Sequence, residues 1–170
     1  MMPSPADIAA TFARARTQAG MGRDEEATEA IEEILAADPR HLGAILLKAW
    51  LRGEDREWDE SLDLTRQAAT LWPRSSEAQN ALARCLHGLG RDDEALERAE
   101  AARTLLAEGD NAAHAAAVYL TLVWCLREKR RYREALAMAE EGLQRAPDAV
   151  LAQWASQVQD ELRAAEKERC

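Results

Sequence analysis

The chain has 170 residues, of which 47% are hydrophobic, chiefly Ala and Leu, with one Phe and two Tyr. This length fits one domain of ordinary size, and the composition favours helix over sheet. The formal net charge is −9, with acidic and basic residues mixed along the chain, which argues against a nucleic-acid partner and against binding to an anionic membrane surface.

The first residues do not form a targeting signal. Residues 1–7 lack the basic start and apolar core of a secretory signal, so we expect a flexible N-terminus and a cytoplasmic protein. The longest apolar stretch, residues 112–126, is interrupted by His114 and Thr121 and is shorter than the ~20 residues that span a bilayer. Neither a metal-binding spacing nor a disulfide framework is formed by the three cysteines, Cys85, Cys125 and Cys170.

One pattern recurs four times along the chain. It ends in Glu followed by Ala or Ser, and it occupies residues 22–27, 56–61, 90–95 and 130–135. The first three copies follow one another at 34 residues and the last at 40, which places a six-residue insertion near residues 108–111. Each copy predicts two helices joined by a tight turn, and three of the second helices are expected to stop before a proline, namely Pro39, Pro73 or Pro147.

Small residues recur where the two helices of a copy would cross. In the first helices they are Ala15, Ala49, Ala83 and Val123, and in the second helices Ala27, Ser61, Ala95 and Ala135. A glutamate precedes each member of the second set, in the first helical turn, where the unpaired backbone N–H groups favour an anion.

In these features the chain resembles the tetratricopeptide repeat family, whose unit has 34 residues, small residues at the crossings and a proline at the end. The resemblance covers about residues 8–147 and implies an all-α fold, a right-handed superhelical solenoid of four helix hairpins. The expected repeats are residues 8–41, 42–75, 76–115 with the insertion, and 116–149. Arg14 and Lys48 stand where the family usually has Leu, so the packing there is expected to differ.

Residues 148–170 are expected to form a capping helix with a frayed tail from Arg163. Asp148 is a plausible N-cap residue. One face of the predicted helix is apolar, and it would cover the last apolar surface of a solenoid. That face carries Leu151, Trp154, Val158 and Leu162.

The sequence predicts no catalytic site, no cofactor and no metal site. His41, His87 and His114 are isolated in the sequence and lack a neighbouring Cys at a ligand spacing. The Gly-x-Gly pairs lie in predicted turns, and the paired carboxylates recur at the starts of second helices, where a role at the helix dipole is the better interpretation. The basic run at residues 127–133 fits a solvated turn after a helix, and the alternative is a docking place for an acidic partner segment.

The resemblance implies that first helices line the concave side of the solenoid and that partner peptides lie there. The residues expected on this side are Phe12, Arg16, Leu46, Trp50, Asn80, Arg84, His87, Leu120, Trp124 and Arg127. Trp and Arg, which are enriched at binding hot spots, alternate along one column of this set. The alternative is that Trp50 and Trp124 simply pack between helices.

The sequence therefore predicts a non-catalytic adaptor or assembly factor that binds a partner protein carrying acidic and apolar residues. One alternative is a chaperone similar to the small acidic tetratricopeptide chaperones of bacterial type III secretion. Another is a self-assembling scaffold, a homo-oligomer joined through Trp72 or through the capping helix. A clamp for a chaperone C-terminus is not expected, because its places hold Phe12, Leu47, Glu77 and Ala81.

Overall fold

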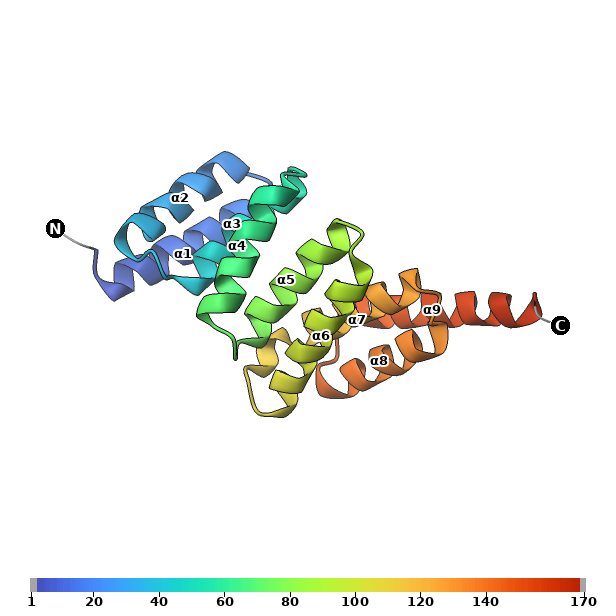
Figure 1. Ribbon diagram of the computed structural model, residues 1–170. Helices are drawn as coiled ribbons and strands as arrows, with labels where there is room; N and C mark the ends of the chain where they lie inside the picture. The colour runs from blue at the N-terminus through green and yellow to red at the C-terminus, as the bar shows by residue number, and fades with distance from the viewer. Residues whose placement is uncertain (1–2, 169–170) are drawn as a thin grey trace. The chain divides into compact units, whose positions relative to one another are not determined.

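The computed structural model describes residues 3–168, and all regular structure in that range is helical (Figure 1). The predicted all-α fold is thereby confirmed. The chain divides into two units, the first ending at Leu71 and the second beginning at Trp72. The right-handed winding of the whole chain stays a prediction. In chain order the helices are α1 (Pro5–Gly20), α2 (Asp24–Ala37), α3 (Leu42–Glu54), α4 (Trp58–Leu71), α5 (Ser76–Gly88), α6 (Asp92–Ala107), the 3-10 helix η1 (Ala112–His114), α7 (Ala115–Glu128), α8 (Tyr132–Arg145) and α9 (Ala149–Lys167).

The first unit consists of the hairpins α1/α2 and α3/α4. Its core is built from small and aliphatic side chains, among them Ile31 and Ile34, with Phe12 and Trp50 packed against it. The two positions that hold cations in place of Leu reach outward to acidic residues. Arg14 pairs with Glu33 at 3.0 Å, and Lys48 lies 3.9 Å from both Glu32 and Glu60. The first-helix packing therefore differs there, as expected, because ion pairs replace apolar contacts.

The second unit consists of the hairpins α5/α6 and α7/α8 and of α9, which packs on α8 and also contacts α7. Its core centres on Tyr119 and Leu122, both fully buried. The Tyr119 hydroxyl donates a hydrogen bond to Glu141 at 2.7 Å. Burial is the largest cause that raises the pKa of Tyr119 to about 12, and this hydrogen bond is the second. Figure 1 shows the last part of α9 continuing beyond α7 and α8.

The eight small residues predicted at helix crossings are all at most 3% exposed. One more small residue, Gly142 on α8, allows an even closer approach. A Cβ atom added there would lie 2.6 Å from Cβ of Tyr119 and 2.7 Å from a methyl group of Leu151. Gly142 therefore fixes the spacing of α8 against both α7 and α9.

All four hairpin turns use the left-handed backbone region at the same position of the repeat. Glycine occupies it at Gly22 and Gly90, with φ of 70° and 71°. Arginine occupies it at Arg56 and Arg130, with φ of 61° and 57°. Because a Cβ atom makes this region unfavourable, two of the turns carry backbone strain.

The helical region extends further at both ends than expected. α1 begins at Pro5, inside the segment predicted to be flexible, because Ser4 and Asp7 form a reciprocal capping box. α9 continues through the predicted frayed tail to Lys167, and Glu166 pairs there with Arg133 of α8 at 2.7 Å. Residues 1–2 and 169–170, which belong to these two predicted segments, lie outside the described residues.

The six-residue insertion follows α6 and leads into η1. Asp110 in this loop accepts a hydrogen bond from the backbone N–H of Ser76, the first residue of α5. Hydrogen bonds from Ser76 lower the pKa of Asp110. The insertion therefore caps a helix of the preceding hairpin.

Replacing Gly142 with Ala should lower the free energy of unfolding by about 1–3 kcal/mol, since the methyl group overpacks the contact with Tyr119. Urea titration followed by circular dichroism measures the change. Gly20→Ala is the control, because no atom lies within 4 Å of its added Cβ atom. Equal stability of the two variants would show that α8 can shift without cost.

Arg56→Gly should raise the free energy of unfolding by about 0.5–1 kcal/mol, because glycine removes the left-handed strain. The reciprocal change, Gly90→Arg, should lower it by a similar amount. Thermal melts of both variants test this pair, and shifts of the same sign would contradict it.

Candidate functional site

The predicted binding residues of the first unit lie on α1 and α3. Phe12 is partly buried and lies 5.0 Å from the ring of His41, and Arg16 is exposed. On α3, Leu46 is buried and Trp50 is partly buried against the core of this unit. Trp50 thus both packs between helices and presents part of its ring to solvent.

In the second unit, aromatic rings form a row across three helices. His87 at the end of α5 stacks on Trp124 of α7, with centroids 6.2 Å apart and an interplanar angle of 18°. Trp124 meets Trp154 of α9 edge to face, again at 6.2 Å. We call His87, Trp124 and Trp154 the aromatic row. Leu120 is partly buried against the core, and Arg84 is exposed.

Arg127 joins this row to α9. Its guanidinium lies 5.4 Å from the ring centroid of Trp154 and binds both carboxylate oxygens of Glu161 at 2.8–2.9 Å. The pKa of Arg127 is raised, and the hydrogen bond to Glu161 is the largest cause. The pair is partly buried, with side chains 30% and 26% exposed, so solvent screens it less than a surface ion pair.

Trp154 and Glu161 were not among the predicted binding residues, although a signal for them was present. Trp154 follows Leu120 by the repeat length of 34 residues, and Glu161 follows Arg127 by the same step. Along α9 the repeat register thus continues past the fourth hairpin. The sequence pattern predicted this helix only as a cap.

Several buried polar atoms on first helices of this unit have no hydrogen-bond partner within the described chain. They include the side-chain carbonyl oxygen of Asn80, a residue only 5% exposed, and the indole nitrogen of Trp124. Buried polar atoms in native proteins are nearly always paired.

The basic run at residues 127–133 is paired with acidic residues of the chain itself. Besides the Arg127 pair, Lys129 contacts Asp93 of α6, and Arg131 binds Glu134 at 2.6 Å. Arg133 pairs with Glu166 of α9. Helix α9 thus supplies two of the acidic residues, Glu161 and Glu166, that pair with this basic run.

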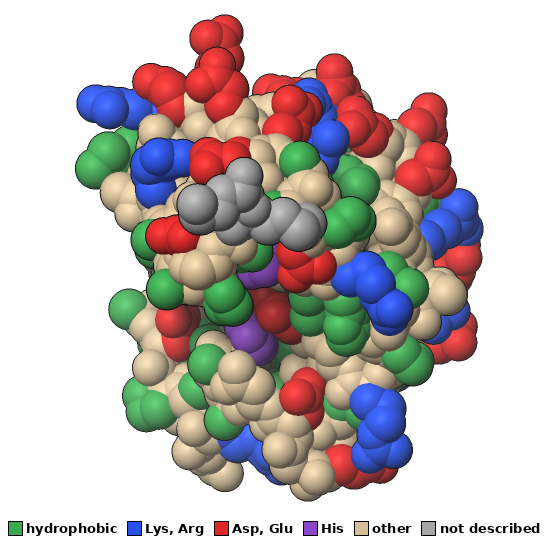
Figure 2. Space-filling view, turned by 90° about the vertical axis from the view of Figure 1, so that its left-hand side faces the viewer, with side chains coloured by type: hydrophobic (Ala, Val, Ile, Leu, Met, Phe, Trp, Pro, Cys, Tyr) green, Lys and Arg blue, Asp and Glu red, His purple; other side chains and the backbone are tan. Residues whose placement is uncertain are grey.

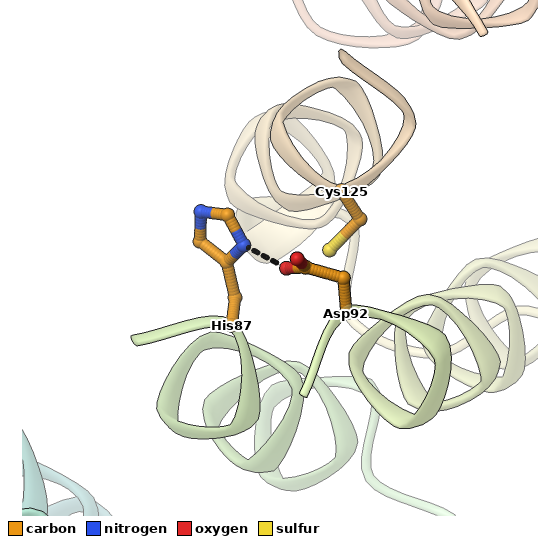
Figure 3. A group of neighbouring side chains, drawn as sticks. All are labelled: His87, Asp92 and Cys125. Atoms are coloured by element: carbon orange, nitrogen blue, oxygen red, sulfur yellow. Dashed lines mark hydrogen bonds and ion pairs between the residues drawn. The ribbon is translucent and has the colours of Figure 1, made fainter. Parts of the chain in front are cut away.

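The fold gives one histidine neighbours that its isolation in the sequence did not predict. His87 is not isolated, because the fold brings it to Asp92 and Cys125 (Figure 3). Nδ1 of His87 lies 2.7 Å from Oδ1 of Asp92, and the Cys125 thiol is fully buried. Burial, followed by the charge of Asp92, raises the pKa of Cys125 to about 12. The three residues come from three consecutive helices, so their meeting was invisible in the sequence spacing.

Acidic and basic side chains lie among one another on the face drawn in Figure 2. None of the helices within residues 3–168 combines the length and the apolar character that crossing a membrane requires.

These features define a class of fold, in which each unit is built from packed helix hairpins. The sequence profile described as Tetratricopeptide repeat matches residues 74–148. No curated protein matches the sequence. Residues 74–148 therefore match the tetratricopeptide repeat in sequence, and the helix hairpins of the described residues have the fold of solved tetratricopeptide repeat structures.

Solved structures agree on the fold. The structure of PilF from Pseudomonas aeruginosa matches 92% of this chain and 69% of its own, with a TM-score of 0.76 and 17% identity. TTC0263 from Thermus thermophilus, described as a thermophilic tetratricopeptide protein, matches 91% of this chain and 82% of its own, with a TM-score of 0.76 and 22% identity. YrrB, described as having an unusual peptide-binding site, matches 88% and 74%, with a TM-score of 0.62 and 21% identity.

Glu161→Gln should lower the free energy of unfolding by about 1–2 kcal/mol, because it weakens a partly buried, bidentate pair with Arg127. Glu166→Gln is the matched control. Its partner Arg133 is 79% exposed, and the change should stay within about 0.5 kcal/mol. Urea unfolding and hydrogen exchange in α9 measure both variants. Equal effects would mean that the Arg127 pair does not fasten α9.

Proposed function

We propose that this protein is an adaptor or assembly factor that binds a segment of a partner protein along α5, α7 and α9. The aromatic row carries the proposal, because it exposes parts of three rings on consecutive first helices. Repeat proteins use extended surfaces of this kind for binding. Aromatic side chains supply large contact areas at low cost in conformational entropy.

The chemistry of this face indicates the kind of segment that would bind. Apolar side chains of the partner would cover the rings of Trp124 and Trp154. Arg84 is exposed on α5 and supplies positive charge to the same face, so an acidic residue of the partner would lie there. The unpaired Asn80 oxygen would accept a hydrogen bond from the partner after a small side-chain shift.

Further features agree with this proposal. Arg16 and Trp50 also place a cation and an aromatic ring on the first helices of the first unit, although Trp50 is partly buried against the core of that unit. The peptide-binding description of YrrB, at 21% identity, agrees with a peptide-binding role on this fold. Cys85 and Cys125 are not joined in a disulfide, which agrees with the cytoplasmic location that we propose.

The alternatives are weaker. A scaffold joined through Trp72 would use a single partly buried ring, whereas the aromatic row offers three. Only Met21 and Val150 are large hydrophobic residues that are exposed within the described chain, which leaves little apolar surface for self-assembly. A secretion-type chaperone would use the same binding face, and identification of its cargo would distinguish it from an adaptor.

Trp124→Ala should weaken partner binding by about 30-fold or more, as expected for a tryptophan at a binding hot spot. Proteins retained from a lysate of the native host by the immobilised wild-type chain and by the variant are compared by mass spectrometry. The affinity for the identified partner is then measured by calorimetry, and circular dichroism checks that the variant remains helical.

Charge reversal gives an independent arm of this test. Arg84→Glu should weaken binding, whereas Arg98→Glu, an exposed arginine on the second helix α6, should leave it unchanged. Undiminished binding by both Trp124→Ala and Arg84→Glu would refute the binding face. Light scattering over a concentration series tests self-assembly, since a scaffold would grow in mass.

A further inference from the structure

Three side chains of the second unit offer one nitrogen, one oxygen and one sulfur ligand to a common point. His87 lies at the end of α5, Asp92 begins α6, and Cys125 lies on α7. One ligand atom of each lies within 4.8 Å of the other two, and Figure 3 shows the side chains pointing toward one another. We propose that His87, Asp92 and Cys125 form a binding site for Zn²⁺.

The donor set suits this ion. Zn²⁺ binds thiolate, imidazole and carboxylate, and four ligands arranged tetrahedrally at 2.0–2.3 Å would lie about 3.3–3.8 Å from one another. Movements of about 1 Å or less bring the atoms into that range. Nδ1 of His87 and Oδ1 of Asp92 would separate from 2.7 Å by about 0.6 Å, and the Cys125 sulfur, which lies within 4.8 Å of both, would approach them by at most about 1 Å. The thiolate selects a borderline or soft metal over Mg²⁺ or Ca²⁺.

Solvent supplies the fourth ligand and takes up the proton. The side chains of His87 and Asp92 are 26% and 27% exposed, so water reaches the ion from their side while Cys125 closes the other. The ion forms bonds to imidazole nitrogen, carboxylate oxygen and sulfur, and the proton of the Cys125 thiol passes to the solvent. Stacking on Trp124 holds the His87 ring in the orientation that directs Nδ1 at Asp92.

The combination of His87, Asp92 and Cys125 has no counterpart in the other repeats. At the position of Asp92, the first repeat also has an aspartate, Asp24, whereas the second and fourth repeats have Trp58 and Tyr132. In the second repeat, the ring of Trp58 fills the space above Gly53, which stands at the position of His87. The third repeat therefore replaces an apolar contact with a carboxylate and an imidazole beside a buried thiol.

The site would fasten the third hairpin to the fourth. Its ligands connect α5 and α6 with α7, and one of them belongs to the aromatic row. Bound Zn²⁺ would fix the spacing of the first helices α5 and α7. This inference stands on the ligand geometry and does not depend on the existence of a partner protein.

Cobalt binding tests the site, because Co²⁺ takes the same ligands as Zn²⁺ and absorbs light when it is bound to a thiolate. The full-length chain carrying Cys170→Ser, which removes the cysteine outside the described residues, is titrated with Co²⁺. We expect one equivalent to produce a thiolate-to-cobalt charge-transfer band in the near ultraviolet and the visible bands of a four-coordinate ion. Zn²⁺ should displace the ion and abolish both.

Two variants on the same background assign the ligands. Cys125→Ser should lose the charge-transfer band, whereas Cys85→Ser, the buried cysteine at the same position of the preceding repeat, should keep it. Asp92→Asn should retain the band and weaken Zn²⁺ binding at least about tenfold, since even outer-sphere changes cost about 10- to 100-fold. If circular dichroism shows that Cys125→Ser fails to fold, Asp92→Asn still tests the metal site.

Absence of a charge-transfer band in the parent chain would overturn the proposal. So would a band that survives Cys125→Ser, or an affinity for Zn²⁺ that is unchanged in Asp92→Asn. None of these results bears on partner binding, which Trp124→Ala and Arg84→Glu test separately.

Discussion

The close approach of neighbouring helices is the constraint on which both units depend. Side chains without bulk at the crossings, such as Ala95 and Ala135, are fully buried, and Gly142 leaves no room even for a methyl group beside Tyr119. Close crossings leave little volume for a core, so small and aliphatic side chains make up most of it, and Tyr119 is the large aromatic residue that is fully buried within the described chain. For the same reason, most of the larger aromatic side chains remain partly exposed, and two of them are available for the aromatic row.

Polar contacts between residues one repeat apart hold successive hairpins in register. Asp110 binds the backbone of Ser76, and Glu161 binds Arg127, each across 34 residues. The second contact makes α9 a continuation of the repeat, because its side chains occupy the places that the first helix of another hairpin would fill. A helix that caps the apolar end thus also extends the proposed binding face with Trp154 and supplies an acidic residue to the basic run after α7.

The third repeat supplies residues to both proposals. Its first helix carries Asn80 and Arg84, which belong to the proposed partner-binding face, and His87, which belongs to the proposed metal site. A metal ion at His87 would restrain the ring that stacks on Trp124. Binding surfaces gain affinity when their side chains are held in place before the partner arrives, so a structural ion would serve the proposed function without taking part in chemistry.

The sequence alone determined the helical hairpins, because the periodicity of small and apolar residues, the turn positions and the prolines are local signals that repeat along the chain. It also indicated the first-helix residues, since a fixed repeat length assigns each residue to a column. Only the tertiary structure decided that Arg127 is bound by Glu161, that Trp124 is shared between His87 and Trp154, and that His87 meets Asp92 and Cys125. Each of these depends on which side chains of different helices come into contact. Interhelical distances and side-chain rotamers determine these contacts. The spacing of residues within one helix carries no information about either.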